Sequence, residues 1–201
     1  MFERRSALAE RVAAGGHDGA EGHRGILITE TRNVHVAQLT AFRDAVHGDP
    51  LRETVLPLLG ALPTDVGSAL EGARTTVLRL GFDQYWVATR NTSLVAEIAR
   101  AIPASVGCVT PLTSRVRLTV EGPEVRLLLC KGIALDLHPR RFVVGRVAQT
   151  ELNHSGVVLL RAGESRFDLY ILRSFAASIW DWLIDAALPI GYDVAVVDWS
   201  G

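Results

Sequence analysis

The chain has 201 residues and a net charge of −1, from 21 basic and 22 acidic side chains that are spread along its whole length. This balance excludes the one-sided basic surface that is typical of nucleic-acid-binding proteins. Charged residues also interrupt every apolar run before it reaches the ~20 residues of a membrane-spanning helix, and no apolar core of a signal peptide is present, so we expect a cytoplasmic protein without a membrane or nucleic-acid partner.

The chain opens with a segment that is rich in glycine and lacks apolar periodicity, AAGGHDGAEGHRG at residues 13–25. Such a composition predicts a flexible N-terminal segment over residues 1–25, followed by one folded domain over residues 26–201. Four side chains of the segment have metal-ligating chemistry: His17, Asp18, Glu21 and His23. Ordering a flexible tether around an ion is costly in entropy, so we predict no metal site there.

Two short strands are predicted next, at residues 26–31 and 34–40. The pair Asp49-Pro50 then offers an N-cap followed by proline at the first helical position, which predicts a helix that starts there. Pro57 lies inside the apolar pattern of this helix and predicts a kink or an early stop.

A hairpin is predicted from the strand-like runs at residues 75–80 and 85–89, which turn residues separate. A helix over residues 94–102 should follow, capped by Thr92 or Ser93 and ended by a proline.

The alternation at residues 116–120 predicts a strand with one solvent-facing side, which carries Arg117 and Thr119. A short helix should open after Gly122-Pro123, and Gly132 stands where a C-terminal cap belongs.

Three more strands are predicted in the last third of the chain, at residues 142–149, 157–161 and 167–173. No regular alternation of strands and helices is present. The pattern therefore predicts an α+β fold of layered antiparallel sheets with helices, rather than a doubly wound fold.

The helix expected after Ser174, its candidate N-cap, is unusually apolar. At 100° per residue its polar side chains fill a stripe of only ~60°, while the apolar arc spans ~220° against the ~100° that packing on one sheet requires. The polar stripe consists of Ser174, Ser178, Asp181 and Asp185. Either another part of this chain or another protein must cover the side with Trp180 and Ile184, and we expect another protein. Trp180 and Trp182 are then packing or interface anchors rather than catalytic residues.

Motifs that carry chemistry are missing. The sequence has no GxSxG elbow, no GxGxxG and no GxxxxGK[ST], and the NHSG at residues 153–156 is typical of a hairpin turn. Cys108 and Cys130 form no zinc pattern, and Cys130 lies near a predicted helix C-terminus, where the dipole opposes a thiolate. We therefore interpret Cys130 as a buried structural cysteine and assign no catalytic, cofactor-binding or metal residue.

Three stretches carry a family resemblance: TTVLRLGFDQYWVATR from Thr75, KGIALDLHP from Lys131 and LYILRSFAASIWDWL from Leu169. In this order, and over more than half of the chain, they resemble the gamma subunits of heterotetrameric sarcosine oxidases. The turn at residues 81–86 departs from the family's Gly-Pro-Asp-Gln-Trp, and residues 111–113 depart from its Asp-Leu-Ser type triplet. The first 70 residues match loosely.

The resemblance implies a fold similar to the tetrahydrofolate-binding aminomethyltransferase superfamily and an assembly of alpha, beta, gamma and delta subunits. Such an enzyme oxidatively demethylates sarcosine to glycine, with formation of hydrogen peroxide and methylenetetrahydrofolate. In the family FAD, FMN, NAD, zinc and tetrahydrofolate belong to the partner subunits, so the resemblance implies a non-catalytic structural subunit without a cofactor of its own. The alternative is a stand-alone folate-dependent one-carbon protein with the aminomethyltransferase fold.

Overall fold

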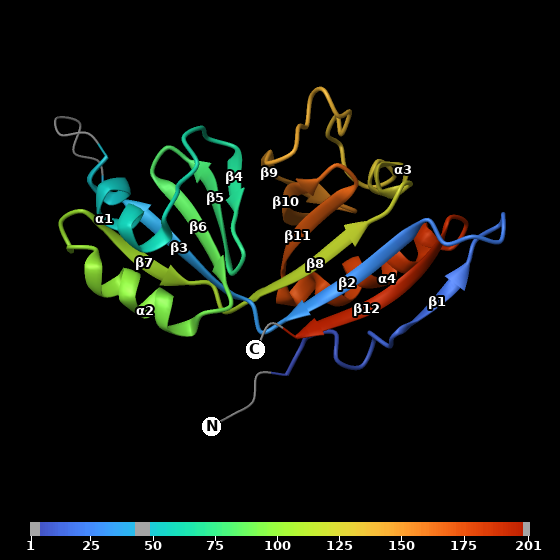
Figure 1. Cartoon of the computed structure of the whole chain (residues 1–201). Helices are drawn as coiled ribbons and strands as arrows, with labels where there is room; N and C mark the ends of the chain where they lie inside the picture. Colours follow the sequence, from blue (N-terminus) through green and yellow to red (C-terminus); the bar gives the residue numbers. More distant parts are fainter. Residues whose placement is uncertain (1–4, 43–48, 199–201) are drawn as a thin grey trace. The chain divides into compact units, whose positions relative to one another are not determined.

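The computed structural model describes residues 5–42 and 49–198, and the chain divides into two compact units (Figure 1). Unit 1 takes its described residues from 5–33 and 114–198, and unit 2 from 34–113. The region that composition predicts as one domain, residues 26–201, therefore contains all of unit 2 as an insertion within unit 1.

Unit 1 is built on a seven-stranded sheet with the order β1-β12-β2-β8-β11-β10-β9. The strands are β1 (Gly15–Asp18), β2 (Ile26–Arg32), β8 (Arg115–Glu121), β9 (Val147–Leu152), β10 (Ser155–Gly163), β11 (Arg166–Leu172) and β12 (Gly191–Asp198). Neighbouring strands are antiparallel except β12 and β2, which are parallel. The α+β class is confirmed, with this parallel pair as an addition to the predicted antiparallel layers.

Two α-helices, α3 (Val125–Leu129) and α4 (Ala176–Ala187), pack on one face of this sheet, and a short 3₁₀ helix, η1 (Arg173–Phe175), precedes α4. Alternate side chains of the strands form the apolar surface on which these helices pack. Val116, Leu118 and Val120 of β8 enter the same hydrophobic core as the helices, and Leu118 lies opposite Leu169 of β11. The predicted apolar side of β8 is confirmed.

Unit 2 has a five-stranded antiparallel sheet with the order β4-β5-β6-β3-β7 and two helices. Its elements are β3 (His35–Ala41), α1 (Pro50–Leu59), β4 (Ser68–Glu71), β5 (Thr75–Gly81), β6 (Gln84–Thr89), α2 (Thr92–Ala101) and β7 (Gly107–Pro111). The predicted hairpin is β5 and β6. Leu39, Leu51 and Ile98 belong to one buried core beneath both helices.

The helix ends of unit 2 test the capping predictions. Asp49 is the N-cap of α1, and its Oδ1 accepts a hydrogen bond from the backbone N of Arg52 at 2.9 Å, as predicted. The helix continues for two residues beyond Pro57 and ends at Leu59. For α2 the cap is Asn91, one residue before the predicted Thr92 or Ser93.

Tyr85 in β6 links the sheet of unit 2 to the start of α1. Its hydroxyl donates to Asp49 Oδ2 at 3.4 Å, and its side chain is fully buried. Burial, and then the charge of Asp49, raise the pKa of the Tyr85 hydroxyl above its ordinary value.

The start of unit 1 differs from the flexible segment that composition predicts. Residues 15–18 form β1, which pairs with β12, and Leu8 is fully buried. The glycines were misleading because they permit close backbone approach. A Cβ on Gly19 would lie 2.4 Å from the carbonyl carbon of Ile190, and one on Gly191, at φ +84°, would lie 2.1 Å from His23 O.

Candidate functional site: helix α4 and the 131–146 loop

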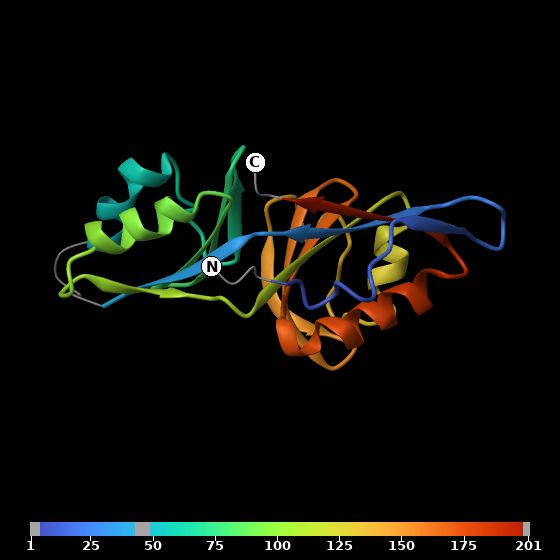
Figure 2. The same ribbon diagram turned by 90° about the horizontal axis from the view of Figure 1, so that it is seen from below.

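The apolar arc of α4 is covered by its own chain. The polar stripe predicted from the sequence is confirmed, because Ser174, Ser178, Asp181 and Asp185 are all exposed. Trp180 nevertheless retains only 4% of its exposed surface, and it shares a core cluster with Leu8 and Val12 of the N-terminal segment. Figure 2 shows this segment beside α4.

Polar contacts hold the N-terminal segment on the helix. Arg11 Nε lies 3.2 Å from Asp181 Oδ1, and Arg173 Nη2 donates to the backbone oxygen of Arg5 at 2.6 Å. The expectation that another protein covers Trp180 is therefore wrong, because Trp180 is buried within this chain, in a core that includes Leu8 and Val12, while Ile184 is partly buried against the same core. Ser174 does not cap α4 either: η1 occupies that position and Phe175 is the N-cap.

The C-terminal half of α4 contacts the start of the connection between α3 and β9, which we call the 131–146 loop. A Cβ on Gly132 would lie 2.5 Å from Trp182 Cζ2, so glycine is needed for close approach. The predicted role of Gly132 as a helix cap is wrong, since α3 ends at Leu129 and Cys130 is its C-cap. Lys131 Nζ donates to Ala186 O at 2.7 Å, a favourable position for a cation near a helix C-terminus.

The 131–146 loop has no helix or strand of its own, yet it is anchored in the core of unit 1. It exceeds the roughly 12–15 residues beyond which irregular connections are uncommon and often functional. Ile133, Leu137 and Phe142 are its buried anchors, at 4%, 2% and 6% exposure. The ring of Phe142 stacks on Phe167 of β11 with 6.4 Å between centroids.

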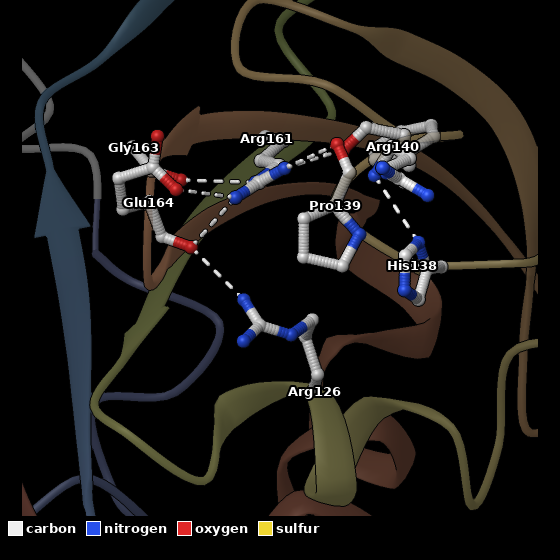
Figure 3. A network of polar contacts seen from close by, with 8 residues as sticks. Arg126, His138, Pro139, Arg140, Arg161, Gly163 and Glu164 are labelled. Atoms are coloured by element: carbon white, nitrogen blue, oxygen red, sulfur yellow. Dashed lines mark hydrogen bonds and ion pairs between the residues drawn. The ribbon is translucent and has the colours of Figure 1, made fainter.

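A buried arginine fixes the outer part of this loop (Figure 3). Arg161 on β10 is 1% exposed, and its guanidinium reaches both the loop and the β10–β11 turn. In the loop, Nη1 donates to Pro139 O at 3.3 Å and to Phe142 O at 2.8 Å. In the turn, Nε donates to Gly163 O at 3.2 Å, and Nη2 donates to Glu164 O at 3.0 Å and Glu164 Oε2 at 2.9 Å. All five N–H donors of the side chain therefore have an acceptor.

The main chain that Arg161 binds forms two exposed turns, one on either side of Phe142. In the first, backbone N–H groups of Arg141 and Phe142 donate to His138 O, and Arg140 and Arg141 are exposed. The second turn, residues 143–146, is closed by a bond from Arg146 N to Val143 O at 3.0 Å. Gly145 takes φ +83° there, which favours glycine.

This geometry corrects the strand predicted at residues 142–149. The strand β9 begins only at Val147, because the backbone before it forms a turn and Phe142 O accepts from the Arg161 side chain. Arg161 is the residue that the sequence reasoning missed. A signal was present, since strand alternation places Arg161 on the same side as Val157 and Leu159, which belong to the core.

A second buried charge lies on the sheet face opposite the helices. Arg117 Nη2 donates to Asp168 Oδ2 at 2.6 Å, and Thr119 Oγ1 donates to Asp168 Oδ1 at 2.7 Å. Arg117 also stacks over the ring of Tyr170, 6.0 Å from its centroid. The predicted solvent-facing side of β8 is therefore wrong at Arg117, which is 5% exposed. Both carboxylate oxygens of Asp168 accept from the chain itself, which is typical of a structural ion pair.

The remaining candidate side chains are engaged elsewhere or exposed. Asp18 pairs with Arg24 at 2.6 Å, and hydrogen bonds to Asp18 and Asp193 raise the pKa of Arg24. His23 Nε2 lies 3.6 Å from Glu124 Oε1. Cys130 is exposed, so its interpretation as a buried cysteine is wrong.

The part of the chain that the structure describes has neither a metal-ligating cluster nor a membrane-spanning helix. Within residues 5–42 and 49–198, no group of three or more His, Cys, Asp or Glu side chains could hold a metal ion. The helices of these residues are also too short or too polar for any of them to cross a membrane.

The fold is that of the aminomethyltransferases. Aminomethyltransferase T of the glycine cleavage system from Bartonella henselae matches 87% of this chain with a TM-score of 0.63 and 15% identity, over 48% of its own length. At this identity the likeness concerns the fold alone. A chain of the heterotetrameric sarcosine oxidase from Corynebacterium sp. U-96, solved with pyrrole 2-carboxylate, is more similar, with a TM-score of 0.78 and 31% identity over 92% of this chain and 94% of that one.

Sequence comparison gives the family. Residues 70–188 match the model of the sarcosine oxidase gamma subunit family. A sarcosine oxidase subunit gamma from Arthrobacter sp. is 33% identical over 183 residues, 89% of this chain and 86% of that protein. One from Corynebacterium sp. (strain U-96) is 38% identical over 128 residues, 62% of each chain. The chain belongs to the sarcosine oxidase gamma subunit family, as the resemblance predicted.

Proposed function

We propose that this chain is a non-catalytic structural subunit of a heterotetrameric sarcosine oxidase and assembles with alpha, beta and delta subunits. The observation that carries this proposal is the match, over 92% of this chain and 94% of the other, to one chain of a solved heterotetrameric sarcosine oxidase. A likeness that extends over almost the entire length of both chains supports an equivalent place in an equivalent assembly.

The proposed assembly oxidatively demethylates sarcosine to glycine in the cytoplasm, with formation of hydrogen peroxide and methylenetetrahydrofolate. FAD, FMN, NAD, zinc and tetrahydrofolate are then held by the partner subunits, and this chain contributes no catalytic residue. The buried charges of unit 1 support a structural role. The donors of Arg161 and the carboxylate oxygens of Asp168 are already engaged by the chain's own groups.

Co-expression of the tagged chain with the three other subunits tests this proposal. We expect all four to co-purify in fixed proportion, with bound flavin and sarcosine-dependent oxygen uptake, and we expect the chain purified alone to show neither. Failure to co-purify would refute the assembly. Flavin or oxygen uptake in the lone chain would refute the non-catalytic role.

The stand-alone folate-dependent alternative is tested with the same lone chain. Calorimetric titration with tetrahydrofolate should give no binding heat if the chain is a structural subunit. Saturable binding at one site per chain would favour the alternative.

A further inference from the structure

We propose that the two exposed turns of the 131–146 loop form a docking surface for an acidic surface on another subunit of the heterotetramer. This inference rests on the proposed function and names the part of the chain that makes the contact. We call it the loop surface and define it by its exposed side chains: Arg140, Arg141, Val143, Val144 and Arg146.

The charge of the loop surface is not compensated by any acidic side chain that the structure describes. Among the described residues, no acidic side chain pairs with Arg140, Arg141 or Arg146. The acids of the loop and of the β10–β11 turn bind other groups. Asp136 accepts a hydrogen bond from the backbone N of His138, and Glu164 binds Arg161. The complement of such a surface is a set of carboxylates on another molecule.

Other exposed arginines of unit 1 have partners within the chain, and Arg173, for example, donates to the backbone oxygen of Arg5. Arg11 pairs with Asp181, and Arg24 pairs with Asp18 and Asp193. Within the described residues of unit 1, the exposed arginines of the loop surface differ from these because their side chains have no partner in the chain.

Apolar side chains lie between these arginines. Val143 and Val144 are 49% and 46% exposed at the tip of the second turn. Arginine combined with exposed apolar side chains is typical of protein interfaces, because burial of the apolar side chains supplies affinity while the charges select the partner.

The loop surface is also held in place before any partner binds. Arg161 fixes the carbonyl oxygens of Pro139 and Phe142, and the ring of Phe142 is anchored against Phe167. A surface that is already ordered loses little conformational entropy on binding. A protein partner is favoured over a nucleic acid because the net charge of the chain is −1.

Charge reversal in the four-subunit co-expression tests the inference. With the variant Arg140→Glu/Arg141→Glu, the amount of partner subunits that co-purify with the tagged chain should fall about tenfold or more below that of the wild type, because like charges would then face each other. The control Arg74→Glu/Arg100→Glu makes the same change at exposed arginines of unit 2 and should retain partners normally. Val143→Ser/Val144→Ser tests the apolar part and should also weaken retention. Thermal unfolding of each lone variant establishes that it is folded.

The outcomes separate this inference from the proposed function. If the wild type retains no partner, the proposed function itself fails. If the wild type and Arg140→Glu/Arg141→Glu retain partners equally, or if the unit 2 control loses them equally, the docking surface is wrong while the proposed function stands. Binding of an RNA oligonucleotide that the variant loses, with unchanged partner retention, would also overturn it.

Discussion

Helix α4 and the 131–146 loop contact each other in unit 1, yet they differ in what covers them. The helix has the larger apolar surface in sequence, and its Trp180 is buried within the same chain, in a core that includes Leu8 and Val12 of the N-terminal segment. The loop has a modest apolar content, and it leaves two valines and three arginines exposed. An excess of apolar surface on one element therefore does not locate a partner, because other parts of the same chain can bury it.

The largest expected effect concerns the loop. Arg161→Met should lower the free energy of unfolding by on the order of 3–5 kcal/mol, because buried carbonyl oxygens lose their donors. Urea unfolding followed by circular dichroism measures this. Arg161→Lys, with three donors in place of five, should have a stability between those of the wild type and Arg161→Met. The control Arg74→Met, at an exposed site, should change stability by less than about 0.5 kcal/mol. An Arg161→Met chain as stable as the wild type would contradict the anchoring role.

The next effect concerns the packing of the N-terminal segment against the core of α4. Leu8→Ala should cost about 2–5 kcal/mol, since it removes a fully buried side chain from the core that contains Trp180. Urea unfolding measures the loss. Leu127→Ala, at a side chain that is 60% exposed, is the matched control and should cost little. Equal small effects at both positions would mean that the N-terminal segment does not cover α4.

The contact between Gly132 of the loop and Trp182 of α4 should lose stability when a side chain is added. Gly132→Ala should cost about 1–3 kcal/mol, because the new Cβ would lie 2.5 Å from the ring of Trp182. Gly156→Ala is the control, since nothing lies within 4 Å of a Cβ there, and it should be neutral or slightly stabilising. Equal stability of the two variants in thermal unfolding would contradict close packing at Gly132.

The smallest expected effect is at the exposed ion pair of the N-terminal segment. Arg11→Ala should lower stability by no more than about 1 kcal/mol, because Arg11 and Asp181 are both largely in solvent. Adding salt should reduce even this difference. A loss as large as that of Leu8→Ala would show that charge, rather than apolar burial, holds the segment on α4.

Local signals in the sequence predicted local structure well. Asp49 and Pro50 start α1, and Asn153 and His154 form the two-residue turn between β9 and β10 with positive φ. These features depend on the backbone preferences of a few neighbouring residues, so a single sequence contains them.

Features that depend on distant contacts could not be predicted in this way. The burial of Arg117 involves Asp168 from another strand, and the core that buries Trp180 includes Leu8 from the N-terminal segment. The glycines at residues 15–25 predict flexibility when taken alone, and only the contact with residues 190–191 shows that Gly19 serves close backbone packing. Dependence on distant contacts also explains why the composition did not divide residues 26–201 into two units.

Covalent footprinting of the lone chain and of the four-subunit complex tests the central comparison most directly. An arginine-directed dicarbonyl reagent reports on Arg140, Arg141 and Arg146, and hydroxyl radicals report on Trp180, with modified residues read by mass spectrometry. We predict that Trp180 is unreactive in both samples, while the three arginines react in the lone chain and are protected in the complex. Reaction of Trp180 in the lone chain and its protection on assembly, with arginines that react equally in both, would contradict the account.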